Sequence, residues 1–146
     1  MKTVTTHSVE ETQAFGVQLS QDLWKTQDGQ QALVVALQGE LGSGKTTFAQ
    51  GFAQGLGVED NVLSPTFVII REYEASGDRR LFHMDCYRLQ NSKDLLELDW
   101  EEIVSDPSNI ILLEWPERVE SLLPKTTIRI QFQPIDETTR RIMVQN

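Results

Sequence analysis

A chain of 146 residues with a hydrophobic share of 39% has enough apolar side chains for one core, and we expect residues 1–146 to form a single domain. The formal charge of −9, from 22 acidic and 13 basic residues, disfavours unaided binding to nucleic acid or to an anionic membrane. No apolar run approaches the roughly 20 residues that cross a bilayer, and the single cysteine, Cys86, fits a reducing compartment, so we expect a cytoplasmic protein.

The N-terminal stretch predicts a strand followed by a helix. Residues 2–6 alternate weakly between apolar and polar side chains, as a strand does. Ser8 and Glu11, three residues apart, form a capping box that opens a helix, which we expect to end near residues 26–29.

A second strand and helix enclose a glycine-rich loop. Residues 32–37 are a continuous apolar run, which is typical of a parallel strand covered on both faces. Beyond the loop, Phe48, Phe52 and Leu56 recur at helical spacing and indicate the buried stripe of a helix that stops near residue 57.

The rest of the chain predicts a hairpin, a polar helical stretch, a second buried strand, a short helix and a closing hairpin. Asp99 and Glu102 form a second expected capping box within the polar stretch. The other elements are expected at residues 67–74 with 80–85, 110–113, 117–122, and 126–132 with 139–144. This order predicts an α/β fold with a parallel core and antiparallel additions.

The loop between residues 39 and 46 carries the strongest functional signal. Gly39, Gly44, Lys45 and Thr46 satisfy the G-x-x-x-x-G-K-[ST] pattern, and Gly42 adds a glycine. Glycines let backbone N–H groups turn toward phosphate oxygens, and the following helix directs its positive end at the same charges. We expect Lys45 to reach the β- and γ-phosphates of ATP and the Thr46 hydroxyl to bind Mg²⁺.

Glu114 ends the apolar run 110–113, where P-loop proteins place an acid beside the metal. With no Asp at this position, Glu114 is expected to bind the metal or its water, to orient the attacking water as a base, or to do both. The alternative is an ordinary charge at the end of a strand.

Two further segments carry candidate site residues. His83, Asp85 and Tyr87 are expected on one face of a strand end, with Asp85 near the metal and His83 in a hydrogen-bonded structural role. Thr66 lies where P-loop proteins often carry a switch that senses the γ-phosphate, although Pro65 beside it also suits a rigid strand entry.

Four blocks, in order along the chain, resemble the TsaE family, the bacterial ATPases of tRNA threonylcarbamoyladenosine biosynthesis. The blocks are residues 39–47, Ser64-Pro65-Thr66-Phe67, His83-Met84-Asp85-Cys86-Tyr87-Arg88 and Glu114-Trp115-Pro116-Glu117. The resemblance covers roughly residues 8–124. It implies a P-loop fold with a mixed, mainly parallel sheet, flanking helices and hairpin additions. It also implies slow Mg²⁺-dependent hydrolysis of ATP to ADP, and action through partner proteins of the threonylcarbamoyl-transfer complex, so that tRNA is reached only indirectly.

Site residues carried over by motif position follow from this resemblance. Thr46 and Glu114 resemble the family's magnesium-binding residues, while Asp85 and Thr66 resemble its switch positions. The candidate catalytic residues are therefore Lys45, Glu114, Asp85 and Thr66. The candidate nucleotide-binding residues are Gly39, Gly42, Ser43, Gly44, Lys45, Thr46 and Thr47.

Two alternative functions remain open, and a third, a GTPase, is disfavoured. A small-molecule kinase would use the same loop but usually adds an arginine-bearing lid, and no long lid insertion is evident. A GTPase would need a guanine-reading segment, and Asn91-Ser92-Lys93-Asp94 has the wrong order. The sequence does not exclude a nucleotide-dependent regulatory binding module, in which hydrolysis is incidental, because Glu114 could hold the metal without activating water.

Overall fold

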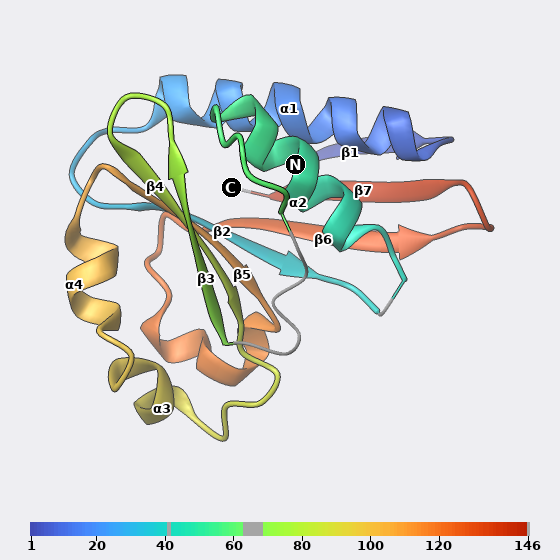
Figure 1. The fold of residues 1–146 in the computed structure, drawn as a ribbon. Coiled ribbons are helices and arrows are strands. Elements are labelled where there is room, and N and C mark those ends of the chain that lie inside the picture. The colour runs from blue at the N-terminus through green and yellow to red at the C-terminus, as the bar shows by residue number, and fades with distance from the viewer. Residues whose placement is uncertain (41, 63–68, 146) are drawn as a thin grey trace.

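The computed structural model describes residues 1–40, 42–62 and 69–145, which form a seven-stranded mixed sheet with helices on both faces (Figure 1). The strands are β1 (Lys2–Thr6), β2 (Leu33–Gln38), β3 (Ile70–Ala75), β4 (Arg79–Asp85), β5 (Asn109–Glu114), β6 (Ile128–Pro134) and β7 (Arg140–Gln145). The helices are α1 (Val9–Thr26), α2 (Lys45–Gly55), α3 (Ser92–Leu96) and α4 (Trp100–Ser105), and η1 (Pro116–Leu122) is a 3-10 helix.

The strand order is β1-β7-β6-β2-β5-β4-β3. The central strands β6, β2, β5 and β4 are parallel, while β3 pairs antiparallel with β4, β7 with β6, and β1 with β7. Both expected hairpins and the expected α/β class are therefore confirmed. Glu114 lies opposite Leu37 on one side and Asp85 on the other, so the loop after β2 and these two carboxylates share one edge of the sheet.

The apolar runs of β2 and β5 are buried on both faces of the sheet. Val35 and Leu112 pack beneath α1 and α2, whereas Val34 and Ile111 pack on the opposite face with Trp100 of α4. Each such side chain contributes about 1.5–3 kcal/mol by leaving water. This double coverage explains why neither strand shows the alternation of a half-exposed strand.

Helices α1 and α2 pack with their backbones in contact, side by side on one face of the sheet (Figure 1). A Cβ added at Gly51 of α2 would lie 2.1 Å from the Gln13 carbonyl oxygen, and one at Gly16 of α1 would lie 2.6 Å from the Phe48 carbonyl oxygen. Only glycine allows this approach. It sets the start of α1 beside the loop that precedes α2.

The two expected capping boxes differ in outcome. The Ser8 hydroxyl accepts the Glu11 N–H at 3.1 Å, and the Glu11 carboxylate accepts the His7 N–H at 3.2 Å, one residue earlier than in a full box. The box at Asp99 is wrong: its φ of 63° is left-handed, and its side chain makes no capping hydrogen bond. A capping side chain reaches the first turn from extended backbone, which Asp99 lacks.

None of the helices in the described ranges has the length and apolar character that a bilayer crossing requires.

Candidate nucleotide site

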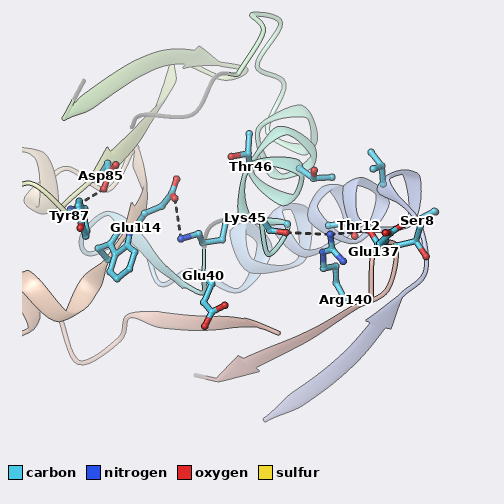
Figure 2. A pocket seen from close by; sticks show the side chains of 16 residues that line it. Ser8, Thr12, Glu40, Lys45, Thr46, Asp85, Tyr87, Glu114, Glu137 and Arg140 are labelled. Carbon is cyan, nitrogen blue, oxygen red and sulfur yellow. Dashed lines mark hydrogen bonds and ion pairs between the residues drawn. The ribbon is translucent and has the colours of Figure 1, made fainter. Parts of the chain in front are cut away.

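A cavity of about 640 Å³ lies at the carboxyl edge of the parallel strands (Figure 2). One end is formed by the glycine-rich loop, the start of α2 and the residues that end β4 and β5. The other end is formed by the start of α1 and the turn between β6 and β7. We call these the loop end and the turn end.

The backbone of the loop depends on its glycines. Gly42 and Gly44 have φ angles of 79° and 104°, which side chains with a Cβ rarely adopt. A Cβ at Gly39 would lie 2.7 Å from the Ser43 hydroxyl and 3.0 Å from Phe132. The Ser43 side chain is buried and its hydroxyl has no partner among the described residues, so Gly39 and Ser43 shape the loop from behind its cavity-facing side.

Lys45 lies at the centre of the loop end and is 8% exposed. Its Nζ donates to the Gly39 carbonyl at 2.6 Å and lies 3.7 Å from Glu114 Oε1. The same Nζ is 5.2 Å from the ring centroid of Trp115, whose left-handed φ of 59° follows directly after β5. A residue with a Cβ in this conformation stores strain, and such strain is often found at functional sites.

The Glu114 carboxylate is buried between two partners. While Oε1 faces Lys45, Oε2 lies 2.7 Å from Nε2 of His83, which is fully buried in β4. Glu114 is therefore held at the cavity wall by contacts on both of its oxygens.

Asp85 lines the cavity beside Glu114 (Figure 2). Its Oδ1 accepts the Tyr87 N–H at 2.9 Å. Burial raises the pKa of Asp85, the Tyr87 hydrogen bond opposes the rise, and the Glu114 charge adds to it. The expectation of one shared face holds for His83 and Asp85. β4 ends at Asp85, and Tyr87 beyond it lines the same cavity as Asp85, with its ring centroid 5.0 Å from that of Trp115.

Cys86 follows β4 at this edge, and its side chain is fully buried. Burial, with the nearby charges of Asp85 and Glu114, raises the pKa of its thiol to about 12. Because the thiolate is the reactive form, the Cys86 side chain acts as an apolar group in the core on the opposite face.

The turn end is organised by Arg140, the first residue of β7. Its guanidinium donates to the carbonyls of Asp136 at 2.6 Å, Thr139 at 3.1 Å and Glu137 at 3.3 Å, and to that of Gly42 at 3.4 Å. Arg140 therefore ties the β6–β7 turn to the loop. Within the described ranges it forms no ion pair with a carboxylate, so its charge remains available to the cavity.

Across from Arg140, the start of α1 contributes Ser8, Val9 and Thr12 to the wall. The Thr12 hydroxyl is bonded to that of Thr6 at 2.7 Å, which joins the helix to β1. The sequence predicted a helix start and a hairpin at these positions, but neither was predicted to belong to the site. The available signal was the spacing of Gly16, Gly51 and Gly55, which indicates closely packed helices.

The predicted site residues separate into three groups. Those that line the cavity are Gly42, Gly44, Lys45, Thr46, Thr47, Asp85 and Glu114. Gly39 and Ser43 support the loop. Thr66, with Ser64, Pro65 and Phe67, lies outside the described residues, so its expected switch role stays a prediction.

The G-x-x-x-x-G-K-[ST] sequence lies between a buried parallel strand and a helix, beside an acidic residue that ends the neighbouring strand, and this arrangement defines the P-loop class. The chain belongs to the TsaE family: the family described as "Threonylcarbamoyl adenosine biosynthesis protein TsaE" matches residues 6–142.

Individual relatives agree over most of the chain. The tRNA threonylcarbamoyladenosine biosynthesis protein TsaE of Treponema pallidum is 40% identical over 111 residues, 76% of this chain and 80% of that protein. The protein of the same name from Haemophilus influenzae is 34% identical over 123 residues, 84% of this chain and 76% of that protein. The crystal structure of YdiB from Bacillus subtilis has a TM-score of 0.72 at 33% identity and covers 97% of this chain and 82% of that one.

Proposed function

We propose that this chain binds Mg²⁺-ATP in the cavity, hydrolyses it slowly to ADP, and thereby serves threonylcarbamoyladenosine modification of tRNA through partner proteins. The observation that carries the proposal is the meeting of the loop, Lys45 and Glu114 in one cavity. Family membership supports the pathway, since the relatives are named for tRNA threonylcarbamoyladenosine biosynthesis.

The loop end is the proposed site of the phosphates. Anions bind well at a helix start because the first N–H groups lack intrahelical acceptors, and α2 starts at Lys45. Lys45 Nζ already lies at the cavity wall, where phosphate oxygens would replace its bond to the Gly39 carbonyl. A buried cation held by such a carbonyl and a carboxylate is prepared for an anionic ligand.

Thr46, Glu114 and Asp85 line the same cavity and offer the hard oxygen ligands that Mg²⁺ prefers. In the described ranges, no group of three or more His, Cys, Asp or Glu side chains is poised to hold a metal by itself. The donor set therefore suits an ion that also takes phosphate and water ligands. When bound, Mg²⁺ would supply charge that stabilises the transferring phosphoryl group.

The turn end is the proposed site of the nucleoside. Val9 offers apolar contact at the wall, while Thr12 and Arg140 offer polar groups. This combination of an apolar surface with a few placed polar groups is typical of small-molecule sites.

Glu114→Gln tests the enzymatic part of the proposal. The substitution keeps the size of the side chain but removes the carboxylate, so we expect single-turnover ATP hydrolysis to fall about 100-fold while ATP affinity changes by less than about fivefold. Both are measured on one preparation, by quenched-flow assay and by calorimetry. Equal losses would assign Glu114 a structural role, and a wild type that binds ATP without hydrolysing it would favour the regulatory binding module.

A further inference from the structure

His83 lies directly behind Glu114. In the parallel pairing of β4 and β5 it is opposite Leu112, two residues before Glu114, so the His83 and Glu114 side chains project from the same face. The imidazole is fully buried, and its Nε2 is 2.7 Å from Glu114 Oε2. Nothing in the proposed binding of the phosphates or metal uses this histidine.

The other ring nitrogen identifies the donor. Nδ1 of His83 is buried and has no hydrogen-bond partner among the described residues. A ring proton on Nδ1 would lack an acceptor in the described part of the chain, whereas a ring proton on Nε2 has the Glu114 carboxylate 2.7 Å away. The arrangement therefore fits an Nε2–H that donates to Glu114 Oε2.

This hydrogen bond gives the two oxygens of Glu114 different partners. Oε2 is held by His83, whereas Oε1 lies 3.7 Å from Lys45 Nζ and faces the cavity. Without the His83 donor, both oxygens become available to the Lys45 ammonium. A closer Lys45–Glu114 ion pair would rotate the carboxylate, so that Oε1 no longer faces the cavity.

We propose that His83 is a positioning residue that holds the Glu114 carboxylate with Oε1 facing the cavity, and so sets the rate of ATP hydrolysis more than the affinity for ATP. The inference rests on the proposed ATPase function and adds a determinant of its rate. His83 does not line the cavity and acts through Glu114.

A matched pair of amides tests the geometry. Gln places its amide nitrogen near the position of Nε2, whereas the shorter Asn places it near Nδ1 and does not reach Glu114. We expect His83→Asn to lower kcat for ATP about 10- to 100-fold, the loss typical of a missing partner behind a catalytic carboxylate, with KM within about threefold. His83→Gln should recover most of kcat.

Thermal melts of both variants control for folding, since each buries an amide in place of the ring. Equal kcat values for the Gln and Asn variants would overturn the inference, and so would a loss confined to KM. An independent measurement on the wild type is the tautomer of His83 from ¹⁵N NMR, which is simple to assign because the chain has two histidines. A proton on Nε2 supports the inference, and a ring protonated on Nδ1 alone overturns it.

The experiments distinguish failure of the proposed function from failure of the role proposed for His83. A wild type without ATP hydrolysis would reject the ATPase and this inference with it. A wild type that hydrolyses ATP, with a fully active and folded Asn variant, rejects the role of His83 alone.

Discussion

The two ends of the cavity are built in different ways. The loop end takes most of its residues from one continuous segment, 39–47, and adds Asp85 and Glu114 from neighbouring strands in register. The turn end joins α1 to the β6–β7 turn, and Arg140 is 98 residues from Gly42, to which it donates. The residues of the proposed phosphate site are thus mostly contiguous in the chain, whereas the opposite wall forms only once the sheet and the two helices have packed.

The electrostatics of the two ends also differ. Lys45 is shared between a carbonyl and the Glu114 carboxylate, whereas Arg140 is bonded to carbonyls and lacks a carboxylate partner among the described residues. In the proposed binding of phosphate, the ion pair at the loop end must rearrange. The cation at the turn end needs no such exchange.

Lys45→Ala should have the largest effect, because it removes the cation of the loop end and, among the described residues, leaves Glu114 with His83 as its one side-chain partner. We expect ATP affinity to fall at least about 100-fold, or about 3 kcal/mol, as when one member of a buried charge pair is truncated. Calorimetry at matched Mg²⁺ measures it, with Arg80→Ala, an exposed cation at the other end of β4, as control. Unchanged affinity would reject phosphate binding by the loop.

Sequence patterns predicted the parts of this molecule that depend on local chemistry. The buried runs of β2 and β5, the stripe of Phe48, Phe52 and Leu56, and both hairpins were predictable because apolar periodicity reflects burial. Lys45 and Glu114 were predicted to share a site, since strand ends in a parallel sheet meet at one edge.

The features that the sequence did not predict depend on tertiary structure and on backbone conformation. Nothing local to Arg140 indicates that β6 pairs with β2 and brings the β6–β7 turn to the loop. Asp99 has the residue type of a helix cap but a left-handed backbone, which sequence spacing does not reveal.

Gly51→Ala tests whether the turn end depends on close helix packing. The new Cβ would meet the Gln13 backbone at 2.1 Å, so α1 must move away from α2. We expect the free energy of unfolding to fall by about 1–3 kcal/mol, typical of overpacking. Urea unfolding measures it, and Gln54→Ala on the exposed side of the same helix should change stability by less than about 0.5 kcal/mol. A fully stable Gly51→Ala would contradict this packing.

Arg140→Ala probes the turn end without disturbing the loop sequence. It removes a cavity-facing cation and its bond to the Gly42 carbonyl, so ATP and ADP should both bind about 10-fold more weakly, or about 1.4 kcal/mol. Arg141→Ala is the matched control, because that exposed neighbour bonds to Gln133 instead. Equal effects of the two substitutions would indicate a general charge effect and remove Arg140 from the site.

The last prediction concerns tRNA and has the smallest expected effect. The isolated chain should bind tRNA negligibly at physiological salt. The cavity wall carries four acidic and two basic side chains: Glu40, Asp85, Glu114 and Glu137 against Lys45 and Arg140. Surface cations such as Arg80 and Arg129 are paired with acids, and the net charge of −9 gives no counterion-release drive toward a polyanion.

These charges disfavour binding of a nucleic acid backbone, so we expect any tRNA association to require partner proteins and to depend on whether ATP or ADP is bound. Filter binding with the chain alone, and then with partner proteins captured in each nucleotide, measures this directly. Micromolar, salt-sensitive tRNA binding by the isolated chain would contradict the prediction. It would point to direct RNA recognition on a surface away from the cavity.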